Sequence, residues 1–141
     1  MLEKFFTEET LSKVKKYFDS LGYVEFAVIF GSYGRGSPFP FSDIDIGIYT
    51  KKEIDLLELG GIITNLEKIF HKNVDVIVLN DLHLKNTVLA YNIAKDSHLI
   101  YCKDLEKWVN FKTWAFIYYL DYKPTYEKIK TEFKKRRLQK C

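Results

Sequence analysis

The chain has 141 residues, a length that suits one compact domain. Hydrophobic residues make up 47% of it and charged residues 29%, with only seven Gly and three Pro, which excludes a disordered or low-complexity chain. A net charge of +3 is too small to indicate nucleic-acid binding by composition alone. We therefore expect a single folded domain over residues 1–141.

The same composition also bears on where the protein works. Its two Cys suit a reducing compartment better than a secreted disulfide scaffold. No stretch approaches the roughly 18 apolar residues of a membrane span, and the first residues lack the continuous apolar region of a signal peptide. We expect a cytoplasmic protein that does not bind a membrane.

The first half of the chain alternates helical and strand patterns. Apolar residues at helical spacing between residues 7 and 21, followed by Gly22, predict an amphipathic helix that ends at the glycine. The apolar run at 24–30 predicts a buried strand, and the β-rich run at 44–49 predicts another. Leu and Ile spacing over residues 53–70 predicts a second long helix, weakened by two central glycines.

The second half continues the alternation. The apolar run at 74–79 predicts a third strand, and Asp81 could cap a helix that reaches about residue 95. A fourth, short strand is expected at residues 98–102, with Cys102 in the core.

A helical extension is expected from about residue 104 to residue 141. Its first helix carries aromatic residues at helical spacing, a pattern more typical of core packing than of base stacking, although part of it could contact a partner helix: Trp108, Phe111, Trp114 and Tyr118. Pro124 should end that helix, because Pro disfavours a helical conformation in the preceding residue. A basic helix over residues 125–138 is expected to follow, and it carries much of the positive charge.

A glycine-rich segment, GSYGRG, follows the first predicted strand from Gly31 to Gly36. Glycines let the backbone approach a ligand and turn so that successive N–H groups converge on an anion, especially where a helix begins. The segment is neither a Walker A loop nor a dinucleotide fingerprint, and a plain strand-to-helix turn could have the same composition.

Two carboxylates, Asp43 and Asp45, lie two residues apart at the start of the second predicted strand. Because strand side chains alternate, both should lie on one face, with Ile44 and Ile46 facing the core. Two close carboxylates repel each other, and a hard cation such as Mg²⁺ relieves the repulsion. An isolated pair would also fit a solvated strand edge, but the neighbouring glycine segment favours a metal site.

A third carboxylate, Asp75, lies inside the apolar run VDVIVL. Burying such a group without a partner is costly, so a partner is expected. If its strand pairs with the strand that carries Asp45, three acids converge, which is enough for two divalent cations that could clamp the oxygens of a phosphoryl or nucleotidyl transfer.

Together, GS-x-x-R-G, SDIDI and an acid in an apolar strand resemble the nucleotidyltransferase superfamily of DNA polymerase β. The short length is similar to its minimal nucleotidyltransferase (MNT) members, the antitoxins of HEPN/MNT toxin–antitoxin pairs. This resemblance implies an α/β (α+β) nucleotidyltransferase fold, in which helices flank a small mixed β-sheet and a helical extension follows.

The resemblance also implies roles for individual residues. It assigns the nucleotide phosphates to Gly31 and Ser32, with Arg35 assisting the loop. It assigns catalysis and the binding of two Mg²⁺ ions to three acids, Asp43, Asp45 and Asp75. Family members often have Ala where this chain has Gly34, a mild departure that leaves the phosphate role intact.

The implied activity is the transfer of AMP from ATP to a tyrosine of a HEPN toxin. Two alternatives remain open at this point. The chain could neutralise a partner by binding without catalysis, or it could modify a small molecule, as aminoglycoside-type relatives do. The expected partners are a nucleoside triphosphate and a HEPN-family protein, nucleic acid is not expected, and homo- or hetero-oligomers are both open.

Overall fold

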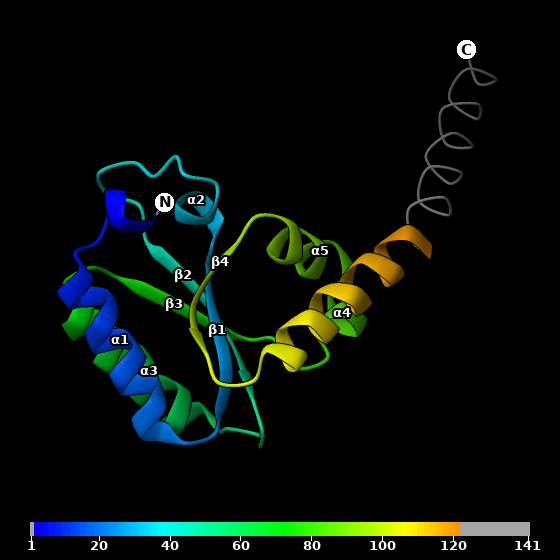
Figure 1. Cartoon of the computed structure of the whole chain (residues 1–141), viewed down its shortest axis with the longest axis horizontal. Coiled ribbons are helices and arrows are strands. Elements are labelled where there is room, and N and C mark those ends of the chain that lie inside the picture. Colours follow the sequence, from blue (N-terminus) through cyan, green and yellow to red (C-terminus); the bar gives the residue numbers. More distant parts are fainter. Residues whose placement is uncertain (1, 122–141) are drawn as a thin grey trace, which may run out of the picture.

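A four-stranded sheet forms the centre of the computed structural model, which describes residues 2–121 (Figure 1). The sheet is mixed and has the strand order β3-β2-β1-β4. Its strands are β1 (Val24–Phe30), β2 (Ile44–Thr50), β3 (Val74–Val78) and β4 (His98–Cys102). The expected α/β (α+β) class with a small mixed sheet is confirmed, and all four strands lie where their apolar runs predict them.

Strand direction brings several functional segments to one edge of the sheet. The central strand β1 pairs antiparallel with both β2 and β4, while β2 and β3 are parallel and joined through a crossover helix. As a result, the end of β1 and the starts of the other three strands meet at the same edge. The glycine segment follows β1 at this edge, and Asp45 and Asp75 lie near the starts of β2 and β3.

Two long helices cover one face of the sheet, α1 (Glu8–Leu21) and α3 (Leu56–Phe70) (Figure 1). The side chains of Thr7 and Asp55 accept hydrogen bonds at their N-termini, and Gly22 ends α1 in the left-handed conformation. Buried residues from these helices and from the sheet form one apolar core, whose sheet members include Ile44, Ile46, Ile48, Val74 and Val76.

The other face is covered by α4 (Leu82–Lys85), α5 (Thr87–Lys95) and a helix over residues 105–121 (Figure 1). The prediction of one continuous helix from Asp81 to residue 95 is wrong. Asn86 leaves the helical conformation, and its side chain caps α5 by accepting a hydrogen bond from the N–H of Leu89. Asp81 itself is left-handed and makes no side-chain capping bond.

The aromatic stripe of the last described helix is divided by packing. Trp108 and Phe111 are buried against Phe26 of β1, as expected for core residues. Trp114 and Tyr118 are exposed, so the core prediction is wrong for them. It is also wrong for Cys102, which is exposed at the end of the edge strand β4.

Some predictions lie outside the described residues, namely the helix end before Pro124, the helix over residues 125–138 and the basic C-terminal residues. From residue 2 to residue 121, the structure contains no helix that is both long enough and apolar enough to cross a membrane.

Candidate active site

The glycine segment forms a one-turn helix, α2 (Gly31–Gly34), that begins directly at the end of β1. The first N–H groups of a helix have no acceptor in a preceding turn, so they are available to an anion. The carbonyl of Gly31 accepts the N–H of Arg35 at 3.1 Å, and the carbonyl of Ser32 accepts the N–H of Ser37 at 3.0 Å. The predicted strand–turn–helix arrangement is therefore present, with Gly31 and Ser32 at its start.

Gly31 is required at its position for two reasons. Its φ of +66° is a conformation that residues with a side chain rarely adopt. In addition, a β-carbon at this position would collide with Oδ2 of Asp45. The backbone at the start of α2 thus lies directly against the carboxylate of β2, so the glycine segment and the acid pair form one site.

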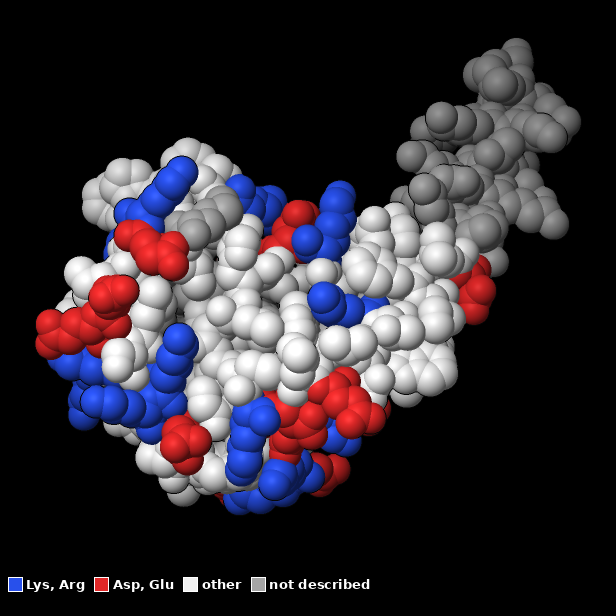
Figure 2. Space-filling model, in the orientation of Figure 1, with Lys and Arg blue, Asp and Glu red and all other residues white. Residues whose placement is uncertain are grey.

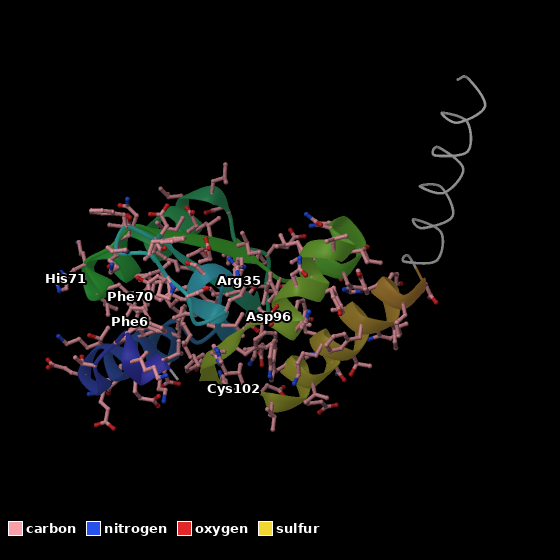
Figure 3. The ribbon with its side chains drawn as sticks, turned by 90° about the horizontal axis from the view of Figure 1, so that it is seen from above. Phe6, Arg35, Phe70, His71, Asp96 and Cys102 are labelled. Carbon is pink, nitrogen blue, oxygen red and sulfur yellow. The ribbon has the colours of Figure 1, made fainter. Side chains whose placement is uncertain are left out.

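Gly34 allows α2 to pack closely against the turn between α5 and β4. A β-carbon at Gly34 would collide with the backbone carbonyl of Asp96 and would lie 3.2 Å from that of Ile29. Seen from above, Arg35 and Asp96 lie close together beside α2 (Figure 3). The sequence offers no signal for the contact between Gly34 and Asp96, because these residues are far apart along the chain and the Asp96 atom involved belongs to the backbone.

Aromatic side chains of the N-terminal segment also pack against α2. The ring of Tyr33 is buried, stacks on Phe6 with centroids 5.2 Å apart and meets Phe5 edge-on at 5.6 Å. The N-terminal segment therefore supports the candidate phosphate loop. Sequence reasoning missed Phe6 and Tyr33, since nothing in their local spacing marks them as partners.

Asp45 and Asp75 are direct neighbours across the parallel pair β2 and β3. They lie on the sheet face opposite to Ile44, Ile46, Val74 and Val76, because side chains alternate along each strand. Strands in a sheet are about 4.8 Å apart. The condition set by the sequence, an Asp75 strand beside the Asp45 strand, is therefore met. Asp43 lies one residue before β2 begins and is exposed.

The electrostatics of Asp45 reflect this clustering. Partial burial raises the pKa of its carboxyl above the ordinary value of 3.8, and the negative charges of Asp75 and Asp43 raise it further. The positive charge of Arg35 acts in the opposite direction. The carboxylate of Asp45 is therefore held in a place where a nearby cation would stabilise it.

The donor chemistry of the three acids suits a hard divalent cation. Mg²⁺ binds carboxylate oxygens together with phosphate oxygens of a substrate, and Asp43, Asp45 and Asp75 lie beside a backbone turn suited to phosphate. Over residues 2–121, however, no set of three or more His, Cys, Asp or Glu side chains is already gathered closely enough to hold an ion. The three His residues of the described range, His71, His83 and His98, likewise form no such set.

A surface hollow adjoins Asp43. It is lined by the loop that precedes β2 and by the turn between α3 and β3, including Phe41, His71 and Asn73. The loop is tied to this turn by Lys72, whose ammonium donates to the carbonyl of Pro40 at 3.3 Å. Sequence reasoning missed this hollow, because its two walls meet only in the folded chain.

Comparison with known proteins places this geometry in context. Residues 12–106 match the family described as polymerase beta, nucleotidyltransferase. Two proteins of Methanocaldococcus jannaschii, both named protein adenylyltransferase, are similar in sequence. One is 36% identical over 94 residues, covering 67% of this chain and 92% of the relative, and the other is 40% identical over 68 residues, covering 47% and 73%.

A similar fold occurs in a chain of the solved complex of tri-AMPylated Shewanella oneidensis HEPN toxin with MNT antitoxin. The two chains superpose with a TM-score of 0.70 and 17% identity, over 91% of this chain and 98% of that one. At this level of identity the similarity establishes the fold.

Proposed function

The chain belongs to the polymerase beta nucleotidyltransferase family and is a nucleotidyltransferase, and from that premise we propose that it is a Mg²⁺-dependent protein adenylyltransferase. Its nucleotide substrate is ATP, and its acceptor is a tyrosine hydroxyl of a HEPN-family toxin. The chain acts as the antitoxin of that pair. The names of its relatives support a protein acceptor, and the toxin–antitoxin complex that contains a chain of the same fold supports the partner.

The contact between Gly31 and Asp45 carries the proposal. It sets a backbone turn suited to phosphates directly against a carboxylate suited to a cation, with Asp75 on the adjacent strand. A nucleoside triphosphate needs both features, because its phosphates must be held and their charge neutralised while one of them reacts.

The strand order suggests how substrates are arranged. The start of α2 follows β1, Asp45 lies on the next strand and Asp75 on the one beyond. We place the terminal phosphates at Gly31 and Ser32, the reacting phosphate at Asp43 and Asp45, and the acceptor hydroxyl at Asp75, on the side of the edge strand β3. Arg35 would add positive charge beside the phosphates.

The proposed reaction is a single displacement. The acceptor oxygen forms a bond to the α-phosphorus of ATP while the bond from that phosphorus to its leaving oxygen breaks, and pyrophosphate departs. Asp75, which is exposed beside Asp45, accepts the proton of the hydroxyl. When bound by Asp43, Asp45 and Asp75, Mg²⁺ would neutralise the phosphate charge and align the reacting oxygens.

Transfer of label from ATP to the partner tests this proposal. The purified chain, ATP labelled at the α-phosphate, Mg²⁺ and its cognate HEPN protein are incubated together, and the modified residue is found by mass spectrometry. The wild-type chain should label a tyrosine, whereas Asp43→Asn/Asp45→Asn should not. A stable complex without any transfer would contradict the proposal and favour neutralisation by binding alone, and label on an aminoglycoside instead of the partner would favour a small-molecule acceptor.

A further inference from the structure

The position of α2 depends on its packing against the rest of the chain. A single helical turn is not stable by itself, because fixing its dihedral angles costs more than its few hydrogen bonds return. The four residues of α2 read GSYG, so Tyr33 carries its one bulky side chain. That ring is 3% exposed and lies in the main core. The place of Gly31 and Ser32 therefore depends on what holds the ring of Tyr33.

Phe6 joins the ring of Tyr33 to α3. Its ring stacks on Tyr33 at an interplanar angle of 29°, and it meets Phe70, the last residue of α3, with centroids 5.0 Å apart. Figure 3 shows Phe6 and Phe70 side by side. Each of the three side chains is buried. Because protein interiors are close-packed, a change in the ring of Phe6 is felt by Tyr33.

The backbone determines where the ring of Phe6 lies. A short 3-10 helix, η1 (Leu2–Lys4), precedes it, and the N–H of Phe6 donates to the carbonyl of Leu2 at 3.0 Å. Thr7, which caps α1, follows it directly. Figure 2 shows charged side chains of both signs over the outer surface of α1, whereas Phe6 belongs to the buried core. Phe6 is thus held between a hydrogen-bonded turn and a capped helix.

A displacement of Tyr33 reaches the candidate site through Gly31. Asp45 Oδ2 lies where a β-carbon of Gly31 would be, so α2 cannot move toward β2 without displacing that carboxylate. Movement in the other direction separates the proposed phosphate ligands from the proposed metal ligand. A complex of ATP with Mg²⁺ must contact both at once, so its affinity depends on their being held at the right separation before it binds.

We propose that Phe6 is a positioning residue for the nucleotide. Its ring, acting through Tyr33, sets the place of Gly31 and Ser32 relative to Asp45. This inference rests on the proposed function, in which Gly31 and Ser32 hold the phosphates of ATP and Asp45 binds Mg²⁺. Phe6 is buried and contributes no group to the site. Its effect is on the affinity for MgATP, beyond the stability that any core residue provides.

Matched core substitutions test this role. Phe6→Leu removes the ring that contacts Tyr33. The control Phe18→Leu removes an identical ring from the same core, where it packs on Tyr17 and Tyr101 instead. Affinity for MgATP is measured by calorimetry on the chain without its partner. Phe6→Leu should bind MgATP about tenfold more weakly, and Phe18→Leu as tightly as wild type.

A double-mutant cycle tests the route through Tyr33. Tyr33→Leu should weaken MgATP binding at least as much as Phe6→Leu does. The double variant should bind about as weakly as Tyr33→Leu alone, because the second substitution removes a contact that is already lost.

Amide hydrogen exchange gives a second readout, which needs no nucleotide. The N–H groups of Arg35 and Ser37 donate to carbonyls of α2, so their exchange reports on the integrity of this turn. It should be faster in Phe6→Leu than in Phe18→Leu. Transfer to the HEPN partner is measured separately. Weaker MgATP binding by Phe6→Leu, without any transfer by the wild-type chain, would support the positioning role and contradict the adenylyltransferase activity. A wild-type chain that binds no MgATP would overturn both.

Three further results would overturn the role of Phe6. The first is wild-type affinity for MgATP in a folded Phe6→Leu variant. The second is an equal loss of affinity in Phe6→Leu and Phe18→Leu, which would tie the affinity to core stability in general. The third is an additive loss in the double variant, which would exclude the route through Tyr33. Thermal midpoints establish that each variant is folded, and Phe6→Met, with its adaptable side chain, replaces Phe6→Leu if it is not.

Discussion

The backbone of Gly31 lies against the carboxylate of Asp45, so that a β-carbon at position 31 would collide with Asp45 Oδ2. The contact joins the end of β1 to the start of β2, two strands that pair antiparallel at this edge. It means that the shape of the candidate phosphate loop and the position of the candidate metal ligand cannot vary independently.

Gly31→Ala should therefore abolish most of the transfer activity. The new methyl group must displace Asp45 or the start of α2, and misplacing a reacting group by about 1 Å can cost about 100-fold in rate. The rate of label transfer from ATP measures the effect. Gly22→Ala is the matched control, because Gly22 also has a positive φ, of 76°, but has no atom near its missing β-carbon. It should cost about 1 kcal/mol in stability and leave the rate unchanged; equal rates in both variants would contradict the prediction.

Gly34→Ala should destabilise the fold as well as the site. Its methyl group would meet the backbone carbonyls of Asp96 and Ile29, which cannot turn away as a side chain could. Overpacking of this kind costs about 1–3 kcal/mol in the free energy of unfolding. Urea denaturation measures it. Gly60→Ala, in a helix and facing open space, should instead stabilise the chain by about 0.5–1 kcal/mol. A Gly34→Ala variant as stable as wild type would show that α2 does not pack closely against the turn at Asp96.

Asp45→Asn should raise stability at neutral pH while removing activity. The pKa of Asp45 is raised above 3.8 in the folded chain, mainly by burial and then by Asp75 and Asp43. Between that value and the folded pKa, the folded state retains a proton that the unfolded state has lost, so stability falls as pH rises through this window and stays reduced above it. Asn carries no charge and avoids the loss.

Thermal midpoints of both forms across this pH window measure the effect, in buffer without divalent cations. The variant should melt higher than wild type at neutral pH, and the difference should shrink as Asp45 becomes protonated in acid. A variant that melts lower than wild type at pH 7 would show that the Asp45 carboxylate stabilises the fold.

Removing the divalent cation should stop the transfer. EDTA is expected to abolish labelling, and added Mg²⁺ to restore it. Mg²⁺ should also raise the thermal midpoint of the wild-type chain, because a ligand at one hundred times its Kd stabilises the folded state by about 2.7 kcal/mol. Asp43→Asn/Asp45→Asn should show no such rise. An equal rise in both proteins would place the cation elsewhere on the chain.

Asp75→Asn should slow the transfer by about 10²–10⁴-fold if Asp75 accepts the proton of the acceptor hydroxyl. The variant should still bind ATP, since Asp43, Asp45 and the start of α2 are intact, and nucleotide binding can be followed by calorimetry. Full activity in Asp75→Asn would assign proton removal to another group.

The local pattern of residues determined much of this protein. Apolar spacing predicted the four strands, α1 and most of α3, because alternation and helical periodicity depend on near neighbours in the chain. The order of GSYGRG, SDIDI and VDVIVL likewise identified the candidate site residues. Local spacing failed where a single side chain competed with the backbone, as at Asn86, whose cap on α5 interrupts the predicted continuous helix.

Only the tertiary structure decided how these parts meet. Strand pairing set Asp75 beside Asp45, and close backbone approach joined Gly31 to Asp45 and Gly34 to Asp96. Packing also separated Trp108 and Phe111, which are buried, from Trp114, which is exposed although it shares their helix. Such outcomes depend on contacts between residues far apart in the chain, and one helix can bury a single side in the core while its other apolar residues stay exposed.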